Sequence, residues 1–146
     1  MGEIRLRVSG EPITQGSMKI VSVRGRAQVV HDKDALLGWR DRIAWQVRGA
    51  SRLAPPLEGP VSVTLMFWLT RPKSHFTRTG ALRSSAPAYP TAKRDLDKLV
   101  RGVLDALTMG MVWKDDGQVI DLDLKKRWAS AAEEPGVYIH AREFTA

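Results

Sequence analysis

The spacing of apolar residues changes several times along the chain, and this change limits the possible folds more than any other feature of the sequence. In residues 61–70 an apolar side chain stands at every second position, which is typical of a buried strand. In residues 96–107 apolar side chains recur three to four positions apart, which is typical of an amphipathic helix, and Gly110 ends the pattern. A chain that mixes these two spacings forms a sheet with helices packed against it.

Further strands are predicted on both sides of these two segments. Residues 3–8, 120–128 and 137–141 alternate apolar and polar side chains, and we interpret the last two as a hairpin because a Pro-Gly turn separates them. A short additional strand is expected around residues 18–23 or 28–30. In the strand 120–128 the side chains expected to face the core are Ile120, Leu122, Leu124 and Trp128.

The first helix is predicted to begin at Asp32, a suitable N-cap, and to end near Gly49. The order is then strand, short strand, helix, strand, long loop, helix, strand, strand, without regular alternation of strands and helices. We predict an α+β fold with one domain over residues 1–146, in which a small mixed sheet carries two main helices on one face.

The long loop, residues 71–94, has no apolar period and is rich in proline. A segment of this length without regular structure is uncommon inside a compact domain, so we expect it to be flexible and functional. It has no acidic residue, and its basic residues are Arg71, Lys73, Arg78, Arg83, Lys93 and Arg94.

The formal charge of +7 on 146 residues is unevenly distributed. The first 94 residues carry 16 basic and 6 acidic side chains, and the last 52 carry 7 basic and 10 acidic ones. A basic body with an acidic region indicates a polyanionic partner and a place for a cation. A basic soluble protein without such a partner explains the charge alone equally well.

Several classes of chemistry are excluded or lack support. The sequence has no cysteine, so disulfides, thiolate metal sites and cysteine nucleophiles are excluded. The three histidines do not have the spacing of a zinc site, and no glycine-rich phosphate loop indicates a nucleotide cofactor. No apolar run is long enough to span a membrane, and the N-terminus lacks the apolar block of a signal peptide. We therefore expect a cytoplasmic protein, with no membrane partner.

Two pairs of aspartates mark the candidate site: Asp95 and Asp97 at the start of the second helix, and Asp115 and Asp116 in the turn that follows it. Helix caps and turns commonly carry acids, so each residue alone has a structural explanation. Carboxylates without a nearby His or Cys suit a hard cation, Mg²⁺ or Mn²⁺, if packing of the helix on a strand brings the two pairs together. Such an ion in a basic protein favours phosphodiester hydrolysis. A non-catalytic DNA-binding module, with the acids as caps, is the alternative.

The segments around these acids resemble the RusA family of Holliday junction resolvases. Three motifs carry the resemblance, in the order and at the separation found in that family: Arg94-Asp95-Leu96-Asp97-Lys98-Leu99, Leu104-Asp105-Ala106-Leu107 and Trp113-Lys114-Asp115-Asp116-Gly117-Gln118-Val119. The resemblance implies a RusA-like α+β nuclease domain that forms a homodimer. It also implies Mg²⁺-dependent cleavage of four-way DNA junctions by paired symmetric nicks, in DNA recombination and repair, with Mn²⁺ as a possible substitute.

The same resemblance implies a role for each acid. Asp95, Asp97 and Asp116 would be the catalytic metal ligands. Asp105, on the same helical face as Asp97, and Asp115 would support these ligands from adjacent positions. A nuclease that acts on flaps or other branched DNA would use the same residues.

Two basic positions of the helix depart from the family pattern. Arg101 stands where a lysine is common, and we expect it to clamp phosphate as a catalytic residue without transferring a proton, because arginine stays charged. Lys98 replaces an asparagine and adds charge beside the site. Phe76 and Tyr89 of the loop are expected to pack onto the body more often than to stack on a base. The residues expected to contact DNA are Arg71, Lys73, Arg78, Arg83, Lys93, Arg94 and Lys98.

Overall fold

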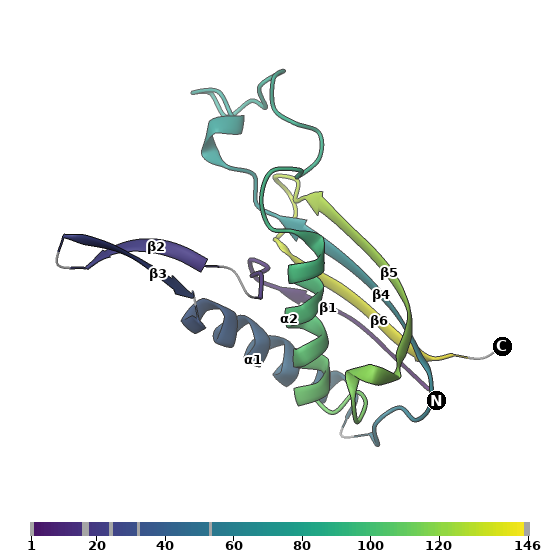
Figure 1. Cartoon of the computed structure of the whole chain (residues 1–146). Coiled ribbons are helices and arrows are strands. Elements are labelled where there is room, and N and C mark those ends of the chain that lie inside the picture. The colour runs from purple at the N-terminus through teal and green to yellow at the C-terminus, as the bar shows by residue number, and fades with distance from the viewer. Residues whose placement is uncertain (1, 16–17, 24, 32, 53, 145–146) are drawn as a thin grey trace.

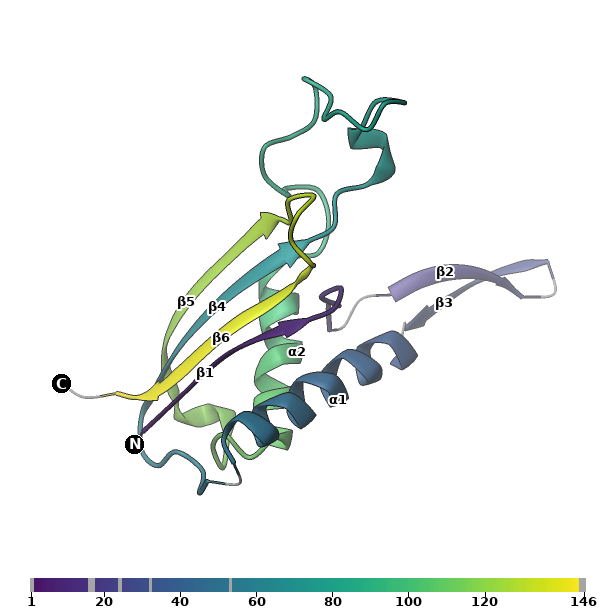
Figure 2. The same ribbon diagram turned by 180° about the vertical axis from the view of Figure 1, so that it is seen from behind.

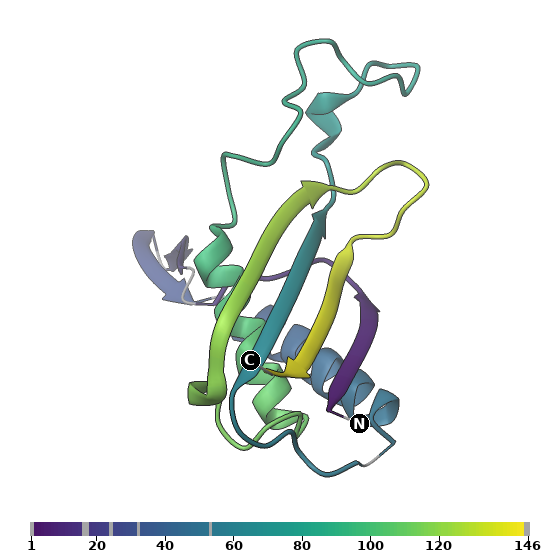
Figure 3. The same ribbon diagram turned by 90° about the vertical axis from the view of Figure 1, so that its right-hand side faces the viewer.

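A mixed four-stranded sheet carries both long helices on one of its faces (Figures 1 and 3). The computed structural model describes residues 2–15, 18–23, 25–31, 33–52 and 54–144. The predicted α+β class, with a small mixed sheet and two helices on one face, is confirmed. The elements of this layer pair are β1 (Glu3–Ser9), β4 (Val61–Leu69), β5 (Val119–Trp128), β6 (Gly136–Glu143), α1 (Lys33–Ala50) and α2 (Leu96–Met109).

The strands lie in the order β1-β6-β4-β5, so the predicted hairpin of the last two strands is wrong. β4 lies between them: it pairs parallel with β5 and antiparallel with β6. The chain leaves β4, passes through α2 and returns as β5, which is the crossover that a parallel pair requires. The turn before β6 indicates only that the chain reverses its direction, not which strand β6 pairs with. Because β5 pairs with one side of β4, β6 pairs with the other side of β4.

A second, two-stranded sheet extends away from the body at the start of α1 (Figure 2). It consists of β2 (Met18–Val23) and β3 (Arg26–His31), paired antiparallel. Both candidate positions for the additional strand are therefore strands, where we expected one. The predicted N-cap Asp32 lies outside the described residues.

The hydrophobic core lies between the sheet and the helices. The predicted apolar faces of α2 and of the central strands are buried, among them Leu99, Val103 and Leu107 of α2 and Leu65 of β4. Gly110 lets the two helices approach, because a Cβ atom there would lie 2.3 Å from Cγ2 of Val47 in α1. Within the described ranges, neither helix combines the length and the apolar character that crossing a bilayer requires.

The edge strand β5 departs from its predicted alternation. The side chains of Ile120 and Leu122 are 58% and 43% exposed, so our expectation that both pack into the core is wrong. The pairing register shifts between Val61 and Ser62 of β4, so Ile120 has no partner in the ladder. Ile120 is the extra residue at this irregularity. Leu122 lies opposite the buried Val63, so it is on the core face, and it is exposed because this edge of the sheet is incompletely covered.

The segment 71–94 stands beyond the ends of β4 and β5 (Figure 3) and is not structureless. It contains the 3₁₀ helix η1 (Lys73–His75) and an antiparallel bridge between Phe76 and Leu82. Backbone bonds close it further, such as the bond from Thr77 N to Ala81 O at 2.8 Å. The sequence did not predict these contacts, because each involves only a few residues and leaves no periodic pattern of apolar side chains.

Candidate active site

Asp95 is the N-cap residue of α2, as its position in the sequence indicates, but its side chain makes no capping hydrogen bond. The carboxylate is exposed, and its described partner is Nζ of Lys98, 3.9 Å away. Because capping does not occupy them, the oxygens of Asp95 are available to accept an external ligand. Helix capping alone therefore does not explain why an aspartate stands at this position.

Asp97, Arg101 and Asp105 lie along one face of α2, as predicted. Positions four and eight residues apart on a helix are separated by about 6 and 12 Å along the axis. The side chains of Asp97 and Arg101 are exposed and make no hydrogen bond or ion pair within the described part of the chain. Asp105 is half-buried, and Nη2 of Arg40 from α1 lies 3.8 Å from its carboxylate.

The second acid pair forms the start of the 3₁₀ helix η2 (Asp116–Gln118). The side chain of Asp115 accepts a hydrogen bond from Gly117 N at 3.1 Å, and Gln118 completes a capping box. Gln118 also donates from Nε2 to Leu57 O and Gly59 O, both at 3.0 Å. Asp115 therefore holds the turn through its capping hydrogen bond, whereas the side chain of Asp116 caps no backbone group of η2.

The carboxyl group of Asp116 holds its proton more strongly than an ordinary aspartate does. Partial burial raises its pKa, and so do a hydrogen bond to Asp115, the charge of Asp115 and the charge of Asp105. The short helix η2, which begins at Asp116, lies beside α2. In Figure 1 the short helix η2 lies at the end of α2 that is opposite to Asp95 and Asp97.

The three predicted ligands do not converge in this arrangement. Within the part of the chain that the structure describes, no group of three or more Asp, Glu or His side chains is placed to hold a metal ion. Carboxylate oxygens are the donors that Mg²⁺ prefers, so Asp95 and Asp97 fit the ion chemically, whereas Asp116 lies at the other end of α2 within the same chain. The assignment of Asp95, Asp97 and Asp116 as ligands stays a prediction.

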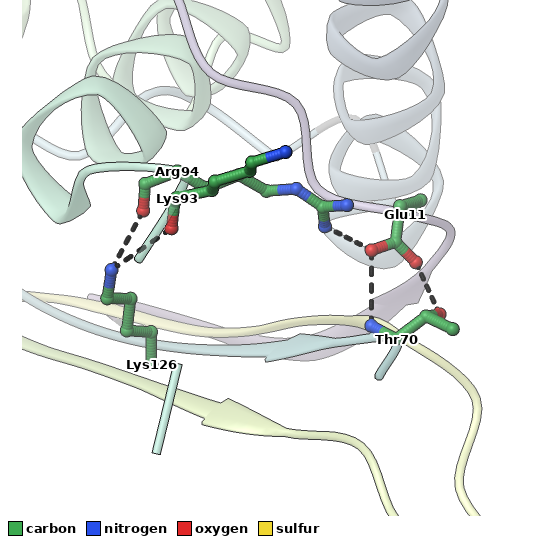
Figure 4. A network of polar contacts seen from close by, with 5 residues as sticks. All are labelled: Glu11, Thr70, Lys93, Arg94 and Lys126. Atoms are coloured by element: carbon green, nitrogen blue, oxygen red, sulfur yellow. Dashed lines mark hydrogen bonds and ion pairs between the residues drawn. The ribbon is translucent and has the colours of Figure 1, made fainter. Parts of the chain in front are cut away.

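A network of polar contacts surrounds the entry to α2 (Figure 4). The guanidinium group of Arg94 forms an ion pair with Glu11, and Glu11 also accepts hydrogen bonds from N and Oγ1 of Thr70, at 3.1 and 2.6 Å. Nζ of Lys126 donates to Arg94 O at 3.0 Å and to Lys93 O at 3.4 Å. Arg94, expected to contact DNA, is therefore engaged within the protein.

Sequence reasoning missed Glu11 and Lys126. Glu11 is a single acid in a stretch rich in turn residues, so no spacing pattern identifies it as functional. Lys126 could have been noticed, because it occupies a core-facing position of β5 between Leu124 and Trp128, where the alternation predicts an apolar residue.

The other basic residues of the segment 71–94 fall into two groups. Arg71 is half-buried: it donates to Pro87 O at 2.9 Å, and its guanidinium carbon lies 5.3 Å from the centre of the Trp128 ring. It therefore braces the segment instead of facing solvent. The four exposed cations, for which the described residues provide no partner, are Lys73, Arg78, Arg83 and Lys93.

The two aromatic residues of the segment behave differently. Phe76 is half-buried at its bridge with Leu82, as the packing interpretation expects. Tyr89 is 59% exposed, and the guanidinium carbon of Arg127 lies 5.4 Å from its ring centre.

The structure thus combines a small mixed sheet, acidic side chains along one helix and a projecting basic segment. The chain belongs to the RusA endodeoxyribonuclease family: the family model described as "Endodeoxyribonuclease RusA" matches residues 9–142. The chain is also 32% identical, over 145 residues and 98% of each sequence, to "Uncharacterized protein YqaN" of Bacillus subtilis (strain 168). The resemblance found in the three acidic motifs is thereby confirmed over almost the whole chain.

Proposed function

We propose that this protein is a Mg²⁺-dependent endonuclease that resolves four-way DNA junctions by paired symmetric nicks. The observation that carries the proposal is the family match, because it extends over residues 9–142 and includes all three acidic motifs. The exposed carboxylates of Asp95 and Asp97 and the exposed cations of the segment 71–94 support it.

The residues of α2 would act on the substrate phosphate. Arg101 lies one turn after Asp97 and has no partner among the described residues, so its guanidinium is free to bind phosphate oxygens in a forked geometry. Lys98 and the four exposed cations of the segment 71–94 would hold the flanking phosphates. When bound by the carboxylates, Mg²⁺ would polarise the scissile phosphate and acidify an attacking water.

Two nicks related by two-fold symmetry need two equivalent active sites. One chain carries a single set of the acidic motifs, so a homodimer with a two-fold axis is the simplest arrangement that supplies both sites. We therefore propose a homodimer that acts in DNA recombination and repair, in the cytoplasm of a bacterial or phage-infected cell.

Cleavage of matched DNA substrates tests the proposal. A synthetic four-way junction, a flap and a linear duplex with the same arm sequences are incubated with the protein, with and without Mg²⁺, and the nicks are mapped. We expect two symmetric nicks in the four-way junction that depend on Mg²⁺. Preference for the flap would instead support the alternative branched-structure nuclease, and no cleavage of any substrate would contradict both.

One observation favours a second candidate, a non-catalytic module that binds branched DNA. The predicted ligands do not converge within the described residues. A module that only binds DNA needs no metal site, so this arrangement is compatible with it. Calorimetric titration with Mg²⁺, with and without junction DNA, separates the two. Saturable binding that is lost in Asp95→Asn supports the nuclease, and no binding in either condition supports the module.

A further inference from the structure

The chain enters α2 through a residue in an unfavourable backbone conformation. Arg94 has φ = 60°, in the left-handed region that residues with a side chain rarely adopt. Asp95 follows directly as the N-cap, and Asp97 lies in the first turn. Because such a conformation persists only where the surroundings hold it, the contacts of Arg94 fix the direction in which both acids leave the loop.

Two side chains from distant parts of the sequence provide these contacts (Figure 4). Glu11, from the segment after β1, pairs with the guanidinium of Arg94. Lys126, from β5, donates to the carbonyl of Arg94 at 3.0 Å and to that of Lys93 at 3.4 Å. One partner therefore holds the side chain of Arg94, and the other holds its main chain.

Glu11 is itself fixed to the end of β4. It accepts hydrogen bonds from Thr70 N at 3.1 Å and from Thr70 Oγ1 at 2.6 Å. Burial raises the pKa of Glu11, but the hydrogen bonds from Thr70 and Arg94 outweigh it and hold the pKa below its usual value. Glu11 is therefore ionised at neutral pH and links the sheet to Arg94.

The acids themselves have little other support. Asp95 makes no capping bond, its ion pair with Lys98 is 3.9 Å long, and Asp97 makes no polar contact with the described residues. Their position relative to a substrate therefore depends on the path of the main chain. A backbone bond from Gln15 N to Lys98 O, 3.0 Å long, ties the first turn to the same segment that carries Glu11.

We propose that Glu11 and Lys126 are positioning residues of the nuclease. They hold Arg94 so that Asp95 and Asp97 face the scissile phosphate, and they do not contact DNA themselves. This inference rests on the proposed function, because it assigns the two residues to the site that performs it.

Two substitutions break the network from opposite sides. Glu11→Gln removes the charge that binds Arg94, and Lys126→Met removes the two bonds to the main chain. We expect each to lower the single-turnover cleavage rate of a four-way junction about tenfold or more, while the dissociation constant for the junction stays within about threefold. Lys126→Arg, which retains donors for both carbonyls, should keep most of the rate.

Matched controls lie elsewhere in the chain. Glu133 also accepts a backbone hydrogen bond, from Ser130 N at 3.1 Å, and pairs with Arg7 at 3.9 Å, so Glu133→Gln makes the same change away from α2. Lys125 is the neighbour of Lys126, and its Nζ pairs with Asp123 at 2.7 Å, so Lys125→Met is its control. Both controls should cleave at the wild-type rate.

The outcomes separate this inference from the proposed function. If the wild type cuts and Glu11→Gln and Lys126→Met cut equally well, or if their cleavage falls only as much as their junction binding, the inference is wrong. If the wild type does not cut, the proposed function fails, and amide hydrogen exchange of residues 94–99 still tests the network. Exchange about tenfold faster in both variants than in their controls supports it, and equal exchange contradicts it. If one variant does not fold, the other decides.

Discussion

The charge of Asp105, in the C-terminal half of α2, raises the pKa of Asp116 in the turn that follows the helix. The two acids are therefore close enough to repel each other, although their elements are separated by the tight turn around Gly110. The relation places Asp116 at one end of α2 and leaves Asp95 and Asp97 at the other.

This relation predicts a change in titration. In Asp105→Asn one source of repulsion is lost, so the pKa of Asp116 should fall toward its usual value and the group should ionise at lower pH. The fall should be partial, because burial and Asp115 are the larger causes. Carboxyl ¹³C NMR titration of Asp116 measures it, and an unchanged midpoint would contradict the assignment.

Asp97→Asn should separate binding from cleavage. Loss of the carboxylate should lower the cleavage rate by about 100-fold or more, because metal assistance contributes several kcal/mol to phosphodiester hydrolysis. Junction binding should be unchanged or tighter, since less negative charge faces the phosphates. Gel-shift and single-turnover assays measure both quantities. Asp34→Asn, which alters an exposed acid in the first turn of α1, is the control and should cleave normally.

The exposed cations of the segment 71–94 should set the salt dependence of DNA binding. Substitution of Lys73, Arg78 and Arg83 by Gln should reduce the slope of log K against log salt by about 0.9 for each phosphate contact that is lost. Arg5→Gln, on the sheet face that the helices do not cover, should leave the slope unchanged. A slope equal to that of the wild type in the triple variant would show that DNA binds elsewhere.

Gly110→Ala should destabilise the fold. Its Cβ would lie 2.3 Å from Cγ2 of Val47 and 3.1 Å from Ala44 O, and relief of such overlap typically costs about 1–3 kcal/mol. Gly38→Ala is the control, because no atom lies within 4 Å of its Cβ and alanine favours a helix interior by about 0.5–1 kcal/mol. Urea denaturation of the two variants should therefore give changes of opposite sign.

The parts of the fold that repeat a local pattern were predictable from the sequence. The alternation in β4 and the stripe of Leu99, Val103 and Leu107 in α2 correctly gave strand, helix and buried face. The strands that pair with β6 were not predictable, because the turn before β6 does not determine which strand it pairs with. The exposure of Ile120 follows from a register shift that no apolar period reveals.

In the candidate site too, some features were predictable from local patterns and others were not. Spacing along α2 correctly placed Asp97 and Asp105 on one face, and motif order identified the family. The ion pair of Glu11 with Arg94 joins residues 83 positions apart, and no local pattern relates them. The pairing of Arg94 was therefore not predictable, since a charge count does not show which charges are already paired.

The projecting basic segment is inserted between the end of β4 and the start of α2, and it stands beyond the ends of the strands. Loop closure depends only weakly on length, and the hydrophobic core lies between the sheet and the helices. Residues 72–92 of this segment can be lengthened, shortened or exchanged while Lys93, Arg94 and the contacts that hold the acids stay in place. If the proposed function holds, exchange of this part of the segment between homologous nucleases should change the preference for branched DNA and leave the cutting chemistry unchanged.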